Sequence, residues 1–109
     1  MASIVICKEF SDAPGGRYIK EGNYSGEAFR EELLLPRFEE AEKKHEKLKI
    51  NFDGCFGFGT SFLEEAFGGL VRKYKKRNAL DVIEIVSQED ETVPGLICKY
   101  VKDAEAKMK

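Results

Sequence analysis

Two segments in the middle of the chain carry the clearest pattern of hydrophobic and polar positions. In residues 47–53, Leu, Ile and Phe alternate strictly with Lys, Asn and Asp, which predicts a strand with one buried face. In residues 61–74, apolar side chains recur every three to four positions, which predicts an amphipathic helix. A sheet covered on both faces would be apolar throughout, so the alternation favours helices mainly on one face of the sheet.

The turn between these segments, residues 54–60, contains three glycines and leads to a helix start. Ser61 and Glu64 match the S-x-x-E pattern, so Ser61 is predicted to cap this helix. The free N–H groups and partial positive charge of a helix N-terminus favour an anion nearby. Gly68 and Gly69 each cost about 1 kcal/mol in a helix interior, which indicates that another backbone or a ligand approaches there.

The remaining apolar runs complete a small α/β fold. They predict, in order, a strand over 3–8, a second strand over 17–20, a helix from Ser25 that Pro36 kinks or divides, a strand over 80–86, and a helix over 93–104 with Pro94 in its first turn. We therefore expect a single domain over residues 1–109. Its mixed sheet of about four strands would open with an antiparallel hairpin and continue with right-handed crossovers.

Composition narrows the class of protein. The net charge of −2 argues against a nucleic-acid-binding surface, although residues 72–77 are locally basic. The first ten residues do not resemble a signal peptide, and no apolar run is long enough to cross a membrane. We therefore expect a cytoplasmic protein that contacts neither nucleic acid nor a membrane.

The cysteines and the single histidine give no catalytic or metal pattern. Cys7, Cys55 and Cys98 are far apart in the sequence, which predicts reduced thiols and no zinc site. Cys7 and Cys98 are expected in the core. Cys55 beside a helix N-terminus would have a lowered pKa and could act as a nucleophile, but no base is placed to assist it. His45 is expected at a helix surface, and we expect no metal, no cofactor and no enzymatic activity.

Aromatic residues in the turn are candidates for binding. Phe56 and Phe58 alternate with glycines, so they either fold into the core or form a hydrophobic contact patch. The segment Gly57–Ser61 could cradle a nucleotide phosphate, but the Gly-Lys-Ser/Thr ending of a Walker sequence is missing.

Two arginines are candidates for contact with an anionic group. These are Arg17, in a polar segment with Tyr18, and Arg30, near the start of the first helix. Arg30 could instead pair with Glu27 or Glu31 along its own helix, which we consider the better interpretation.

Several of these motifs resemble the STAS-like domain family of unknown function. The resemblance is carried by Gly16-Arg-Tyr18, Ser25–Arg30, Asn51–Gly54 and Ser61–Leu70, and it covers about residues 14–104. This family is related to the STAS fold of bacterial anti-sigma-factor antagonists. In those proteins a serine at the start of the helix after the third strand is phosphorylated by a histidine-kinase-like ATPase, and the added charge breaks the complex.

The resemblance implies a non-enzymatic regulatory module whose partner is a protein such as a histidine-kinase-like ATPase. The predicted contact or phosphoacceptor residues are Phe56, Phe58, Gly59, Thr60 and Ser61. Thr60 and Ser61 keep the hydroxyls of the STAS motif, but the acidic residue before them and the glycine after them are absent. Since Glu64 and Glu65 already occupy this helix end, Ser61 is better interpreted as a cap and Thr60 as the freer phosphoacceptor. The alternative is a small-ligand or nucleotide-binding domain that uses the helix N-terminus at Gly57–Ser61.

Overall fold

The computed structural model describes residues 2–55, 57–76 and 78–108. Within these residues, three strands form one parallel sheet, β1 (Ala2–Val5), β2 (Leu48–Asn51) and β3 (Ile83–Val86), in the order β1-β2-β3. In this register Asn51 pairs with Val5 on one side and with Val86 on the other. The carboxyl ends of the three strands therefore meet at one edge of the sheet.

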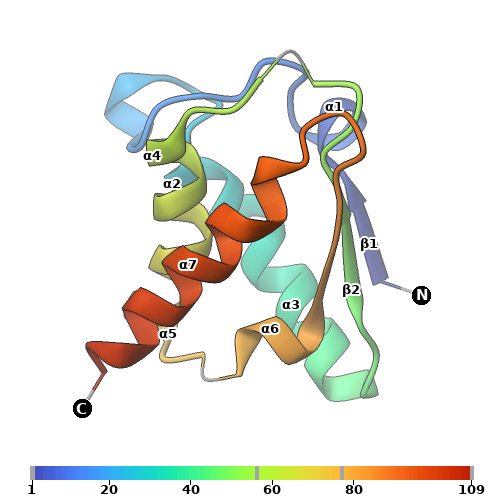
Figure 1. Ribbon diagram of the computed structural model, residues 1–109, viewed down its shortest axis with the longest axis vertical. Coiled ribbons are helices and arrows are strands. Elements are labelled where there is room, and N and C mark those ends of the chain that lie inside the picture. The colour runs from blue at the N-terminus through green and yellow to red at the C-terminus, as the bar shows by residue number, and fades with distance from the viewer. Residues whose placement is uncertain (1, 56, 77, 109) are drawn as a thin grey trace.

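Three long helical runs lie on one face of this sheet (Figure 1). The first consists of α2 (Gly26–Phe29), a π-helical turn η2 (Arg30–Leu34) and α3 (Leu35–Lys44). The second consists of α4 (Thr60–Leu63), a π-helical turn η3 (Glu64–Gly68) and α5 (Gly69–Tyr74), and the third is α7 (Thr92–Ala106). Shorter turns are α1 (Ile6–Glu9), the 3-10 turn η1 (Ile19–Glu21) and α6 (Ala79–Val82).

Local sequence explains the start of the first run and its passage through Pro36. The Oγ of Ser25 accepts a hydrogen bond of 3.1 Å from the Ala28 N–H, so Ser25 is the predicted N-cap. The Leu35 N–H bonds to the Arg30 carbonyl, five residues back, which is π-helical geometry. Pro36 follows at this change of hydrogen-bond register, so the helical run continues through it into α3.

The core lies between the sheet and the helices and is rich in phenylalanine. Phe29 packs against Phe62 and Phe67 at ring-centroid distances of 5.7 and 6.2 Å, and all three rings are fully buried. Burial of each such ring contributes about 1.5–3 kcal/mol of stability. On β2, residues 48 and 50 are buried and residue 49 is exposed, which confirms the predicted alternation.

The predicted opening hairpin and the fourth strand are wrong. Residues 17–20 do not pair with β1, and part of them forms η1. Side chains satisfy the backbone groups that a hairpin would have used on the free edge of β1: Glu9 Oε2 accepts the Val5 N–H at 2.8 Å, and Arg37 Nη1 donates to the Ser3 carbonyl at 2.8 Å. The sheet is therefore parallel throughout its three strands, instead of mixed with about four.

The first and last strands are shorter than predicted. The chain turns into α1 at residue 6, and the apolar run that starts at residue 80 is helical in α6 until β3 begins at Ile83. In the parts of the chain that the structure describes, no helix has the length and apolar character needed to span a membrane.

Candidate functional site

The turn after β2 leaves the carboxyl edge of the sheet and is tied to the loop after β3. Glu89 Oε1 accepts the Gly54 N–H at 2.7 Å, and the Glu89 N–H donates to Asp53 Oδ1 at 2.9 Å. A cavity of about 230 Å³ lies between the two loops, lined by Phe52, Cys55, Gly57, Phe58, Ser87, Glu89 and Asp90. The cavity is smaller than the usual 300–1,000 Å³ of small-molecule sites, and its two carboxylates would repel a phosphate.

Phe58 lies at the rim of the core. It is partly buried, and its ring meets Phe52 edge-on at a centroid distance of 4.9 Å and Phe62 at 5.9 Å. The geometry of Phe58 therefore favours a packing role over a free contact patch. Phe56, its predicted companion, lies outside the described residues.

The helix after this turn begins at Thr60 with Gly59 as its N-cap, two residues before the predicted cap. The prediction that Ser61 caps this helix is wrong, because Ser61 lies inside the first turn and the Glu64 carboxylate is turned toward Arg17 and Arg72. Thr60 is exposed and Ser61 is partly buried, so the Thr60 hydroxyl is the more accessible of the two candidate phosphoacceptors.

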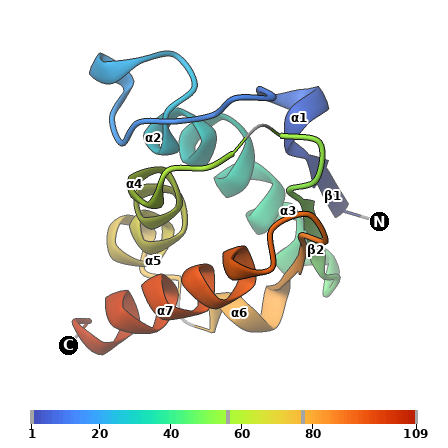
Figure 2. The same cartoon turned by 45° about the horizontal axis from the view of Figure 1, so that its top comes forward.

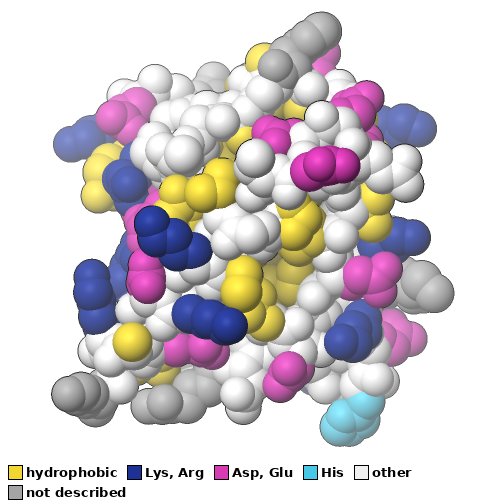
Figure 3. Space-filling view, in the orientation of Figure 1, with side chains coloured by type: hydrophobic (Ala, Val, Ile, Leu, Met, Phe, Trp, Pro, Cys, Tyr) yellow, Lys and Arg dark blue, Asp and Glu magenta, His cyan; other side chains and the backbone are white. Residues whose placement is uncertain are grey.

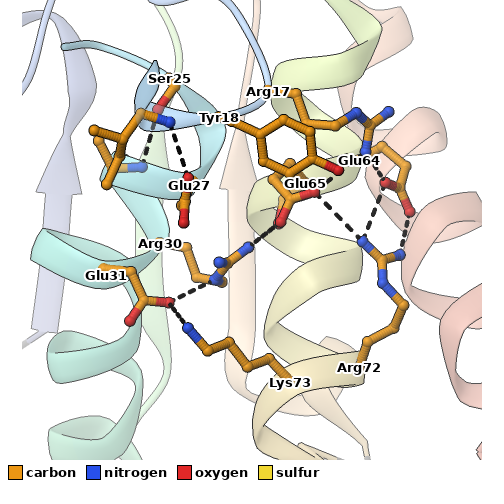
Figure 4. Close-up of polar contacts among 12 residues, drawn as sticks. Arg17, Tyr18, Ser25, Glu27, Arg30, Glu31, Glu64, Glu65, Arg72 and Lys73 are labelled. Carbon is orange, nitrogen blue, oxygen red and sulfur yellow. Dashed lines mark hydrogen bonds and ion pairs between the residues drawn. The ribbon is translucent and has the colours of Figure 1, made fainter. Parts of the chain in front are cut away.

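A network of ion pairs joins the first and second helical runs (Figure 4). Arg30 is only 3% exposed, and its Nη1 donates to the Glu65 carbonyl at 2.8 Å and to Glu65 Oε2 at 2.6 Å. Its Nε donates to Glu31 Oε2 at 2.8 Å. Arg30 thus makes the predicted contact with Glu31, and its guanidinium is also directed into the protein toward Glu65.

The outer half of the network fixes the loop before α2. Arg17 Nη1 donates to Glu64 Oε1 at 2.5 Å and to Glu65 Oε1 at 3.3 Å, and Arg72 also pairs with Glu64 (Figure 4). Burial alone would raise the pKa of Glu64, but hydrogen bonds from Arg72 and Arg17 hold this pKa below its usual value. The two arginines proposed as anion contacts thus face carboxylates of the protein itself.

These ion pairs explain the two adjacent glycines of the helix. A Cβ on Gly69 would overlap Arg30 Nη1 and lie 3.2 Å from Arg30 Cζ. A Cβ on Gly68 would lie 2.7 Å from Glu64 Oε2 and 2.9 Å from Arg72 Nη1. The predicted close approach is present, but the prediction that another backbone or a ligand makes it is wrong, because the neighbouring atoms belong to charged side chains of the same protein.

A feature that the sequence analysis missed is the loop over residues 15–24, which we call the aromatic loop. It stands out from the body of the molecule (Figure 2) and exposes three large apolar side chains, Tyr18 at 41%, Ile19 at 50% and Tyr24 at 51%. Its ends are fixed by hydrogen bonds of 3.0 Å, from the Gly15 N–H to the Tyr24 carbonyl and from the Gly26 N–H to the Gly16 carbonyl. The side chains are thus presented on an ordered backbone.

Another face of the molecule shows apolar atoms at the surface. In Figure 3 they gather in a hollow at its centre, over the region of α7 and β3. Side chains of these two elements that pack against the core while remaining partly exposed are Ile85, Leu96 and Tyr100. Since each is anchored in the core, this face is the rim of the core and is less exposed than the aromatic loop.

Cys55 does not have the lowered pKa of an activated catalytic nucleophile. Burial, followed by the neighbouring Cys7 thiol, raises the pKa of the Cys55 thiol to about 11, so the predicted lowering is wrong. Cys7 and Cys98 were expected in the core but are only partly buried, and all three thiols are free. His45 ends α3 at an exposed position, as predicted. Within the described ranges, no three His, Cys, Asp or Glu side chains gather to hold a metal ion.

Comparison with models of known protein families identifies the family of this chain. The family model described as "STAS-like domain of unknown function (DUF4325)" matches residues 25–93. This range includes strands β2 and β3 and the two helical runs that the ion-pair network joins. No curated protein and no solved structure matches the chain.

Proposed function

Because the chain belongs to the family of STAS-like domains of unknown function, we propose that it is a non-enzymatic, cytoplasmic regulatory module that acts by binding a protein partner. The relation of this family to anti-sigma-factor antagonists makes a histidine-kinase-like ATPase the partner that we propose. The observation that carries the proposal is the aromatic loop.

The aromatic loop has the properties of a binding surface. Tyr18, Ile19 and Tyr24 expose apolar area on one protruding segment, and aromatic side chains are enriched among the residues that dominate binding energy. The ion pair of Arg17 with Glu64 holds the loop against the first turns of the α4–α5 run. Binding to an ordered loop loses less conformational entropy than binding to a mobile one, so more of the contact energy becomes affinity.

The same ion pair suggests how phosphorylation would act. Thr60 lies four residues before Glu64 in one helical run, so the two side chains project from the same face. A phosphoryl group on Thr60 would compete with the Glu64 carboxylate for the Arg17 guanidinium. Loss of the Arg17 contact would release the base of the aromatic loop and weaken partner binding. Ser61 is the second candidate phosphoacceptor.

The direct test is binding of the purified protein to a purified histidine-kinase-like ATPase of the same organism, measured by isothermal titration calorimetry. We expect Ile19→Asp to weaken binding at least tenfold, because it places a charge in the contact while leaving the core untouched. Lys99→Gln is the matched control, since Lys99 is exposed on α7 and the change removes one positive charge. Equal affinity of Ile19→Asp and wild type would refute the assignment of the loop.

Thermal shift measurements separate this proposal from the nucleotide-binding alternative. A ligand at a hundred times its dissociation constant stabilises the folded protein by about 2.7 kcal/mol. A rise in melting temperature with nucleotides, together with no binding of the ATPase, would replace the partner-binding proposal with the alternative.

A further inference from the structure

Two of the three free cysteines, Cys7 and Cys55, lie in neighbouring segments at the carboxyl edge of the sheet. Strands β1 and β2 are neighbours and pair Val5 with Asn51, so the segments that follow them emerge side by side. A Cβ on Gly54 would lie 2.8 Å from Cys7 Sγ and 3.6 Å from Cys7 Cβ. Cys55 is the next residue, and consecutive Cα atoms are about 3.8 Å apart. Cys55 thus follows directly on a residue that comes close to the Cys7 thiol.

A second contact brings the Cys55 side chain toward the same turn. Its thiol donates to the Ser11 carbonyl at 3.7 Å. Ser11 follows α1 and its N–H bonds to the Ile6 carbonyl at 2.9 Å, so Ser11 and Cys7 belong to one compact turn. The Cys7 thiol also contributes to the raised pKa of Cys55, as expected for neighbouring sulfur atoms. Cys98 lies apart, on α7.

We propose that Cys7 and Cys55 form a reversible intramolecular disulfide when the protein meets a peroxide, and that this bond clamps the turn after β2 onto α1. Both side chains are partly exposed, so a small oxidant can reach them. Disulfides need Cα atoms about 4.4–6.8 Å apart, which the contacts of Gly54 and Cys55 with the α1 turn allow. The bond would restrain the segment that leads into Thr60 and Ser61, adjacent to the proposed phosphoacceptors.

The reaction proceeds in two balanced steps. The Cys7 thiolate attacks one peroxide oxygen, the O–O bond breaks, and a sulfenic acid and hydroxide form. The Cys55 thiolate then attacks the Cys7 sulfur, the S–S bond forms, the S–O bond breaks, and hydroxide leaves. Protons from the two thiols convert both hydroxides to water, so two thiols and one hydrogen peroxide give one disulfide and two waters. Because Cys55 must ionise for the second step, closure becomes faster as the pH rises.

The test is to treat the reduced, folded protein with hydrogen peroxide and to count thiols with a chromogenic disulfide reagent after denaturation. We expect the count to fall from three to one in the wild type and from two to zero in Cys98→Ser, with a loss of 2 Da and full recovery on reduction with dithiothreitol. Peptide mapping without reduction should give the Cys7–Cys55 pair. The Cys7→Ser and Cys55→Ser variants should form no intramolecular bond.

A control in urea makes the result specific to the folded protein. Cys55 is 43 residues from Cys98 and 48 residues from Cys7, so the unfolded chain in urea should form these two pairs with similar probability. A Cys7–Cys55 pair that predominates only without urea therefore depends on the fold. Retention of three thiols by the folded wild type would overturn the proposal. Linkage to Cys98, linkage between two copies, or stepwise addition of oxygen to single cysteines would do the same. The wild-type map does not depend on how well the serine variants fold.

Discussion

Substitution of Gly69 by alanine tests whether the buried ion pair decides the residue at this position. Alanine is favoured over glycine in a helix interior by about 1 kcal/mol, so the change would ordinarily stabilise α5. Here the new Cβ would overlap Nη1 of Arg30, which is buried and bonded to both the carbonyl and the carboxylate of Glu65. The Arg30 guanidinium must move, and at least one of these bonds must break.

The magnitude follows from the two opposing effects. Breaking a buried ion pair by displacing one partner costs about 3–5 kcal/mol, and the helix preference of about 1 kcal/mol offsets only part of this. We expect Gly69→Ala to lower the free energy of unfolding by roughly 2–4 kcal/mol. Urea unfolding at pH 7, followed by circular dichroism, should show a midpoint lower by about 1–2 M with little change in slope.

The neighbouring glycine provides a matched control. Gly68→Ala has the same intrinsic helix preference, but its Cβ meets the ends of Glu64 and Arg72, which are partly exposed and can turn toward solvent. An exposed pair contributes about 0–1 kcal/mol, so we expect Gly68→Ala to stay within about 1 kcal/mol of wild type. An unfolding midpoint for Gly69→Ala at or above that of Gly68→Ala would refute the reasoning. Combined with Arg30→Met, Gly69→Ala should instead become stabilising, because the clash is gone.

Two further predictions concern the acidic network and the turn. The pKa of Glu64 lies below its ordinary value in the folded protein. Glu64 therefore contributes stability above its unfolded pKa of about 4.3, and this contribution is lost as the pH falls through the folded value. In urea unfolding between pH 7 and 3, the free energy of unfolding should fall less steeply with decreasing pH for Glu64→Gln than for wild type, and parallel curves would contradict this. Phe58→Ala should lower the free energy of unfolding by about 1–3 kcal/mol, because the ring packs on Phe52 and Phe62. Ile19→Ala should change the free energy of unfolding by no more than about 0.5 kcal/mol. Equal effects of the two changes would show that Phe58 is not part of the core.

Local patterns in the sequence predicted the elements that depend on local physics. The alternation in β2, the cap at Ser25 and the apolar stripe of the α4–α5 run are each set by a few neighbouring residues, and the structure has all three. The predicted cap at Ser61 is absent although the S-x-x-E pattern is complete. The Glu64 carboxylate, which would complete the capping box, is instead bound by Arg17 and Arg72. Neither arginine lies within the four-residue S-x-x-E pattern.

The predicted β-hairpin is absent from the structure for a related reason. Residues 17–20 have the composition of a strand, but a strand needs a free edge to pair with. Glu9 and Arg37 occupy the backbone groups on the edge of β1, and Arg37 comes from a helix far along the chain. The N–H groups of Tyr18 and Ile19 are in turn satisfied by the carboxylates of Glu21 and Glu27. Both segments therefore satisfy their hydrogen bonds without each other.

Two sequence signals pointed to the ion-pair network: the expected pairing of Arg30 with Glu31 along the helix, and the adjacent glycines, which indicated a close approach without naming the neighbour. Since Arg17 belongs both to this network and to the base of the aromatic loop, stability and binding are coupled through it. A variant of Arg17 that loses partner binding would not locate the contact surface, because the loop and the helix start would both be disturbed. Ile19 makes no hydrogen bond through its side chain and is half exposed, so a charge at this position isolates binding from the network.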